Sequence, residues 1–127
     1  YPGGHGLLWD LVENKTSKKL IESFLSNDKP VSFVCHAPAI LKNIQDTEGN
    51  ALVKGKNVTG FTNGEEKAVE LKDVVPFLIE DMMKEKGANY SKIGDWQPYA
   101  LEDGLLITGQ NPASSSLVAK LLMNKLQ

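Results

Sequence analysis

The stretch that decides the fold is Val31-Ser32-Phe33-Val34-Cys35-His36-Ala37-Pro38. Its first four residues are short, apolar and partly β-branched, as in a buried strand. Pro38 suits the first turn of a helix. Cys35 is therefore expected on a sharp turn between a strand and a helix, which is the arrangement of a nucleophile elbow.

Cys35 has two interpretations. As an elbow nucleophile it lies at a helix N-terminus, which favours the thiolate and lowers the thiol pKa. As a structural residue it is an inert buried cysteine, which is common in proteins. The strand–Cys–His–helix context favours the reactive interpretation. We expect Cys35 to have a strained backbone and to be partly accessible from a pocket.

A nucleophilic cysteine needs a base, and the base needs an orienting group. His36 is the natural base, although it can instead be a polar residue that caps the helix. The orienting group should be a carboxylate from another loop. Glu65 and Glu66 follow an expected strand that ends at Gly60, so they can lie above the same edge of the sheet. Taken alone, the two glutamates fit a solvated helix start better.

Two further loops could contribute residues to the site. Gly3-Gly4-His5-Gly6 is either a plain turn or a loop whose backbone approaches closely and completes an oxyanion hole with the His36 amide. His5 is the only other histidine, and its spacing gives weak grounds for a metal, so no metal is expected. Trp96, Pro98 and Tyr99 either line a pocket mouth or pack in the core, and core packing is favoured.

The rest of the chain alternates between helices and strands. Helices are expected at 17–26, from 38 to 43, at 65–71, at 76–86 and after a cap at Asn111-Pro112; strands are expected at 31–34, 57–60 and 90–93, with a hairpin of 99–101 and 105–107. This order predicts an α/β fold, a three-layer sandwich in which helices cover both faces of a mostly parallel sheet. Functional residues gather at the carboxyl ends of strands in such sheets.

Composition excludes several classes of protein. The 127 residues suffice for one domain, and 14 basic against 16 acidic residues give a net charge of -2. No nucleic-acid partner is therefore expected. No apolar run approaches the ~18 residues that span a bilayer, so no membrane partner is expected. A single cysteine fits a reducing compartment, and we expect a cytoplasmic protein.

Five motifs occur in a fixed order: Gly3-Gly4-His5-Gly6, Val34-Cys35-His36-Ala37-Pro38-Ala39, Leu52-Val53-Lys54-Gly55-Lys56, Val58-Thr59-Gly60-Phe61-Thr62-Asn63 and Ile107-Thr108-Gly109-Gln110-Asn111-Pro112-Ala113-Ser114. With them the chain resembles the ThiJ/PfpI family of the class I glutamine amidotransferase-like superfamily. It is most similar to the branch of heat-shock chaperones and glutathione-independent glyoxalases. The resemblance implies a flavodoxin-like fold.

The resemblance also implies a Cys-His-carboxylate triad. Its members match Cys35, His36 and Glu66, with Glu65 as the fallback acid. The oxyanion donors correspond to the backbone amides of Gly4 and His36. No cofactor is implied.

The function implied by the resemblance is that of a glyoxalase, which converts a 2-oxoaldehyde such as methylglyoxal to a 2-hydroxy acid. Related members are described as protein deglycases, amidases or peptidases. A stress-response holding chaperone is the alternative of another class, and the sequence gives it little direct support. The partner is then a small aldehyde substrate, and we expect a homodimer.

This sequence departs from the family pattern at two points. Ala37 stands where the family usually has glycine, so the elbow can differ slightly. The family also has about as much chain again before its Gly-Gly-His-Gly turn, including the first strands and a glutamate that hydrogen-bonds the cysteine. We therefore expect residues 1–127 to be the C-terminal portion of a single domain, and a second polypeptide segment to supply the N-terminal strands.

Overall fold

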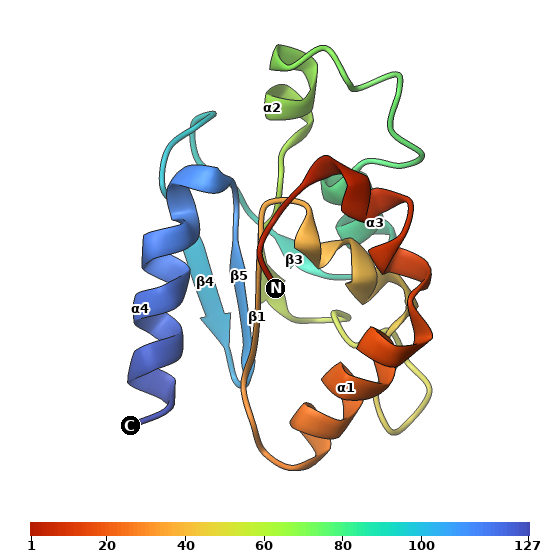
Figure 1. Cartoon of the computed structure of the whole chain (residues 1–127), viewed down its shortest axis with the longest axis vertical. Helices are drawn as coiled ribbons and strands as arrows, with labels where there is room; N and C mark the ends of the chain where they lie inside the picture. Colours follow the sequence, from red (N-terminus) through yellow and green to blue (C-terminus); the bar gives the residue numbers. More distant parts are fainter.

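A three-stranded sheet forms the centre of the computed structural model, which describes all 127 residues (Figure 1). The strand order is β1 (Val31–Val34), β5 (Leu106–Gly109) and β4 (Ala100–Asp103). β1 runs parallel to β5, and β4 is antiparallel to it. β4 and β5 are the expected hairpin, and its turn contains Gly104 with a φ of 59°.

Helices lie on both sides of this sheet. α4 (Ser115–Lys125) packs against all three strands, whereas α1 (Lys15–Ser26) and the 3-10 helix η3 (Ala37–Asn43) contact β1 from the other side in Figure 1. The remaining elements are the 3-10 turns η1 (His5–Leu8), η2 (Leu11–Glu13) and η4 (Pro112–Ser114), the helices α2 (Asn63–Ala68) and α3 (Ile79–Glu85), and the short parallel pair β2 (Asn57–Val58) and β3 (Asn89–Tyr90). None of the helices combines the length and the apolar character that crossing a membrane requires.

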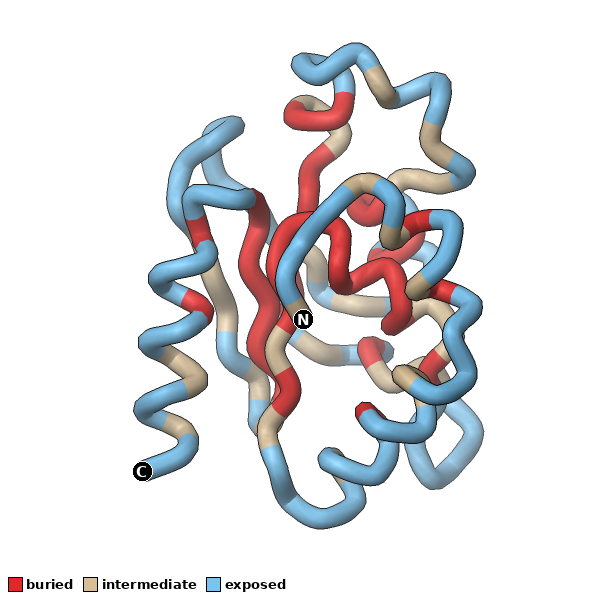
Figure 2. Tube along the Cα trace, in the orientation of Figure 1, coloured by how far each residue is buried: buried red, intermediate tan, exposed pale blue.

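The core is centred on β1, β5 and η3, where Figure 2 shows the longest runs of buried chain. All four residues of β5 are buried, as expected for a strand covered on both faces. Phe33 of β1 and Ile40 and Leu41 of η3 are completely buried. This packing fixes the turn between β1 and η3, where Cys35 lies.

Several elements differ from the sequence prediction. The helix after Cys35 is a 3-10 helix, in which the Ala39 N–H donates to the His36 carbonyl. The expected strand 57–60 ends at Val58, because the Thr59 N–H bonds to the side chain of Thr108 instead of a backbone carbonyl of a neighbouring strand. The expected strand 90–93 shortens to Asn89–Tyr90, and the Ile93 N–H bonds to a side chain as well.

Two helices begin later than predicted. The helix expected at 76–86 begins at Ile79, after the extended residue Leu78. The final helix begins at Ser115, because Asn111 first caps the 3-10 turn η4.

Candidate active site

Cys35 lies on a turn at the carboxyl end of β1, as expected. Its φ of 64° is in the left-handed region, which a non-glycine residue rarely adopts. Two backbone hydrogen bonds hold this conformation: the Cys35 N–H donates to the Gly109 carbonyl and the Phe61 N–H donates to the Cys35 carbonyl, both at 3.0 Å. The expected strained backbone is confirmed. The hydrogen bonds with Gly109 and Phe61 keep Cys35 in this conformation.

The glycine-rich loop approaches the same sulfur. A Cβ atom on Gly3 would lie 2.7 Å from the Cβ of Cys35, so only glycine fits there. Gly4 has a φ of 150°, which also favours glycine. Hydrogen bonding by the backbone amides of His36 and Gly4 acts to lower the pKa of the Cys35 thiol. These are the two amides that the family resemblance implied as oxyanion donors.

His36 is completely buried and connects Cys35 to a carboxylate. Its Nδ1 atom lies 3.3 Å from Sγ of Cys35, and its Nε2 atom lies 2.7 Å from Oε2 of Glu66. An ionised carboxylate can only accept, so Nε2–H donates to Glu66 and Nδ1 is left to accept the thiol proton. The structure thus brings together the three residues that the family resemblance implied.

Glu65, the fallback acid, faces elsewhere although it too is completely buried. Its Oε1 atom accepts from the Thr62 N–H in a capping box at the start of α2. Its Oε2 atom accepts from the Trp96 N–H at 2.8 Å and from the Asn111 side-chain amide at 2.7 Å. Neither glutamate belongs to a solvated helix start, and only Glu66 reaches His36.

Sequence reasoning missed the role of His5. Its Nε2 atom lies 2.7 Å from Oε1 of Glu66, and its ring centroid lies 3.9 Å from that of His36. His5 and Glu66 are 61 positions apart, and no spacing rule joins them. The only signal was that His5 belongs to the glycine-rich loop.

His5, His36 and Glu66 also offer three metal-type donor atoms within 4.8 Å of one another. Both Nε2 atoms are already bonded to the carboxylate. A metal ion would have to displace these two hydrogen bonds.

A cavity of about 430 Å³ opens beside Cys35. Its lining comprises Gly3, Gly4, His5, Val34, Cys35, His36, Phe61, Val69, Trp96, Pro112 and Ser115. Trp96 is 42% exposed and packs edge-on against Phe61, so the preference for core packing of Trp96 is wrong. Its backbone is held over the cavity by the hydrogen bond to Glu65.

The electrostatics of Cys35 and His36 favour their neutral forms. Burial raises the pKa of the Cys35 thiol to about 12, and the negative charges of Glu65 and Glu66 add to this rise. The backbone amides of His36 and Gly4 act in the opposite direction and lower the pKa. Burial also lowers the pKa of His36, although Glu66 acts in the opposite direction. The expected lowering of the cysteine pKa is therefore wrong, because burial outweighs the opposing effect of the His36 and Gly4 amides. At neutral pH the pair is a thiol and a neutral imidazole.

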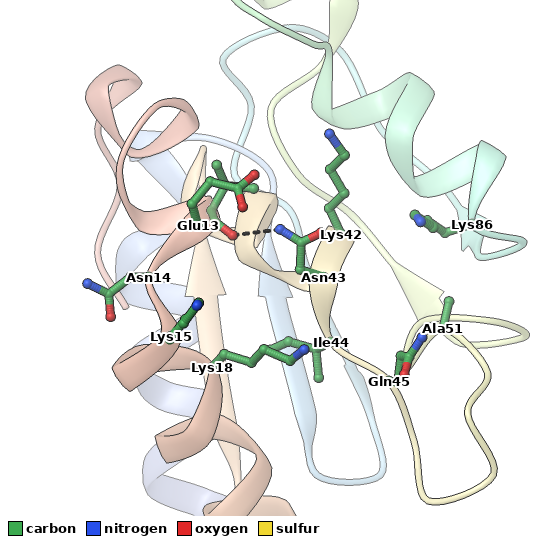
Figure 3. A pocket seen from close by; sticks show the side chains of 11 residues that line it. Glu13, Asn14, Lys15, Lys18, Lys42, Asn43, Ile44, Gln45, Ala51 and Lys86 are labelled. Carbon is green, nitrogen blue, oxygen red and sulfur yellow. Dashed lines mark hydrogen bonds between the residues drawn. The ribbon is translucent and has the colours of Figure 1, made fainter.

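A second cavity of about 440 Å³ lies between the start of α1 and the end of η3 (Figure 3). Lys15, Lys18, Lys42 and Lys86 line it, but Figure 3 shows their side chains spread around the hollow rather than converging. The Lys42 ammonium lies over the Phe77 ring, 4.6 Å from its centroid. The second cavity shares no lining residue with the cavity beside Cys35. The Cys35 cavity is therefore the candidate active site.

Comparisons with known proteins identify the family of the chain. The DJ-1/PfpI family model matches residues 1–125. The glutathione-independent glyoxalase HSP31 of Saccharomyces cerevisiae is 36% identical over 91% of this chain and 52% of its own length. The crystal structure of glyoxalase III from Candida albicans is similar with a TM-score of 0.92 and 32% identity, over 97% of this chain and 54% of that one. The X-ray structure of Francisella tularensis Rapid Encystment Protein 24 KDa gives a TM-score of 0.95 and 40% identity, over 98% of this chain and 56% of that one.

The chain thus spans about half the length of the curated relatives that it matches. The family match nevertheless covers nearly every residue of the chain, and it includes Cys35, His36 and Glu66. The flavodoxin-like α/β class that the motifs implied follows from the same match. The chain belongs to the DJ-1/PfpI family.

Proposed function

We propose that the protein containing this chain is a cofactor-independent glyoxalase that converts a 2-oxoaldehyde, such as methylglyoxal, to a 2-hydroxy acid. The observation that carries the proposal is the continuous contact from the Cys35 sulfur through both nitrogens of His36 to Glu66, beside a cavity that Cys35 and His36 line. The relatives named as glyoxalases support the choice of substrate class.

The first step is addition of sulfur to the aldehyde. Because Cys35 and His36 are both neutral, His36 accepts the thiol proton through Nδ1 as the sulfur attacks the aldehyde carbon. Glu66 stabilises the imidazolium that forms. The backbone N–H groups of Gly4 and His36 stabilise the oxygen of the hemithioacetal while it carries negative charge.

The second step moves a proton between the two carbons of the substrate. His36 first returns the thiol proton to the hemithioacetal oxygen and is neutral again. It then removes the proton from the former aldehyde carbon while the neighbouring carbonyl oxygen gains a proton, which gives an enediol. Protonation of the neighbouring carbon and loss of the hydroxyl proton on the former aldehyde carbon give a thioester of the 2-hydroxy acid. Water then cleaves the thioester and restores the Cys35 thiol. The net reaction adds one water to the oxoaldehyde, so it needs no oxidant, reductant or cofactor.

The test is production of 2-hydroxy acid from methylglyoxal by the full-length protein. Cys35→Ala and Cys35→Ser should abolish it, whereas the exposed substitution Glu13→Gln should leave it unchanged. Product formation that survives Cys35→Ala would disprove the mechanism.

Protein deglycase, amidase and peptidase activities would start from the same sulfur, so a full-length protein that acts on those substrates and not on methylglyoxal would favour them. Holding of unfolded clients that survives Cys35→Ala would indicate a chaperone.

We also propose that residues 1–127 form the C-terminal portion of one domain and that another segment of polypeptide pairs with the free edge of β1. The Tyr1 amino group donates to the Ser32 carbonyl at 2.9 Å, and the Val34 N–H donates to the Tyr1 carbonyl at 3.3 Å. This is the hydrogen-bond pattern of a parallel pair. The Tyr1 ring stacks on Phe33, with 5.3 Å between the ring centroids. A strand that enters through Tyr1 would continue this pairing along β1.

Hydrogen exchange tests the added strand. In the full-length protein the Ser32 amide should exchange far more slowly than in residues 1–127 alone. Equal exchange in the two would contradict the proposal. The expected homodimer stays a prediction, which sedimentation of the full-length protein tests.

A further inference from the structure

His5 is the one ionisable side chain of the cavity that the mechanism above does not use. It lies at the start of η1, and its Nε2 atom is 2.7 Å from Oε1 of Glu66. The other carboxylate oxygen, Oε2, lies 2.7 Å from Nε2 of His36. A single carboxylate therefore bridges two imidazole rings that come from distant parts of the sequence.

The packing makes this bridge the main support of the Glu66 carboxylate. The side chain of Glu66 is 2% exposed, and the two histidines are its hydrogen-bond partners. The rings of both histidines pack against Phe61, at 5.5 Å and 4.2 Å between centroids. Removal of His5 would leave Oε1 buried without its partner, which is a costly state for a charged oxygen.

The two rings differ in their exposure to solvent. The side chain of His5 is 33% exposed, whereas that of His36 is fully buried. The positive charge of His5 opposes a second proton on His36, while the charges of Glu66 and Glu65 from α2 attract one. The remaining ionisable neighbour of His36 is the thiol of Cys35.

We propose that His5 is a positioning residue of the active site, which fixes the Glu66 carboxylate so that this carboxylate orients His36. The charge of His5 opposes a second proton on His36, so Nδ1 stays free to accept the thiol proton. This inference rests on the proposed role of His36 as the base. It predicts that His5 extends activity toward lower pH, because a base works only while it is unprotonated.

The experiment compares His5→Phe, His5→Gln and the control Glu13→Gln in the full-length protein, with kcat/KM for methylglyoxal measured from about pH 5 to pH 9. His5→Phe should lower kcat/KM about tenfold or more, since a hydrogen bond to a charged group is lost. It should also move the acidic side of the pH profile of kcat/KM to higher pH, because loss of the His5 charge raises the pKa of His36. His5→Gln keeps a hydrogen-bond donor for Oε1 of Glu66, so it should recover most of kcat/KM at high pH. The acidic side of its pH profile should still be shifted to higher pH.

A uniform loss of rate in both variants, with the acidic side of the pH profile unmoved, would show that His5 is only structural and would overturn the proposal. An NMR titration of the His36 ring separates this result from failure of the glyoxalase proposal, because it needs no substrate. The midpoint for His36 should rise in His5→Gln and in His5→Phe. An unchanged midpoint overturns the role of His5, whether or not methylglyoxal is a substrate.

Discussion

The carboxylates of Glu65 and Glu66, neighbours in α2, leave the helix in different directions and bond to different parts of the molecule. Glu66 Oε2 lies 2.7 Å from Nε2 of His36, and Glu65 Oε2 lies 2.8 Å from the backbone nitrogen of Trp96. One short helix thus supports both the proposed base and the wall of the cavity. The two substitutions to glutamine should therefore have separable effects.

Glu66→Gln should reduce turnover much more than stability. A glutamine places an NH2 group against one of two imidazole N–H donors, so the orientation and charge that support His36 are lost. We expect kcat to fall by about a hundredfold or more, the scale of general acid–base catalysis. Steady-state kinetics and thermal unfolding of the same preparation measure the two effects. Proportionate losses of activity and stability would assign Glu66 a structural role.

Glu65→Gln should have the opposite balance. Its carboxylate accepts from Thr62, Trp96 and Asn111 while completely buried. An NH2 group in place of one oxygen faces a donor, and we expect a loss of about 1–3 kcal/mol in the free energy of unfolding. Urea denaturation measures it, and KM should rise as the Trp96 wall loosens. A loss of kcat as large as that of Glu66→Gln, at unchanged stability, would show that the acid is misassigned.

Gly3→Ala should disrupt the site, whereas Gly6→Ala in the same loop should not. The new methyl group would lie 2.7 Å from the Cys35 Cβ in the first case, and it would meet nothing within 4 Å in the second. Displacement of the loop takes the Gly4 amide away from the sulfur, so kcat should fall. Parallel assays of the two variants test this, and equal activity would show that the loop is free to move aside.

The Cys35 thiol should react slowly with iodoacetamide at neutral pH. Burial raises its pKa to about 12, and the reactive thiolate appears only as pH rises toward that value. The alkylation rate should therefore increase about tenfold per pH unit through the alkaline range, without a plateau near neutrality. Mass spectrometry of the peptide that contains Cys35 gives the rate, with the urea-unfolded protein as the reference. A plateau near pH 7 would indicate a preformed thiolate.

Glu80→Gln should lower stability in a way that depends on pH. Burial raises the pKa of Glu80, but hydrogen bonds from Lys84, the Asn63 N–H and Lys92 outweigh burial and bring the pKa to about 2. A lowered pKa stabilises the fold above the unfolded value of 4.5, and this contribution is lost as pH falls toward 2. Chemical denaturation should show a deficit of about 1–3 kcal/mol near pH 7 that closes in acid. The exposed variant Asp73→Asn is the control, and a deficit independent of pH would contradict the ion-pair explanation.

The sequence predicts those features that depend on neighbouring residues. β1 and the turn at Cys35 follow from one short stretch, and the hairpin of β4 and β5 follows from its turn residues. The contact of His5 with Glu66 was missed, because it joins positions far apart in the sequence. The Cys35 pKa was mispredicted for a related reason: the helix start is visible in the local sequence, whereas burial of the thiol is a property of the folded chain.

The left-handed backbone at Cys35 has a consequence for evolution and engineering. A residue with a Cβ atom costs about 1–2 kcal/mol in this conformation, and glycine does not. Mutational screens that select only for thermal robustness therefore have a reason to favour glycine at position 35, which deletes the nucleophile. The cysteine at this position therefore carries a standing thermodynamic cost, which a chemical role of its thiol would explain. Libraries built on this scaffold should keep position 35 fixed or should couple every stability screen to an activity readout.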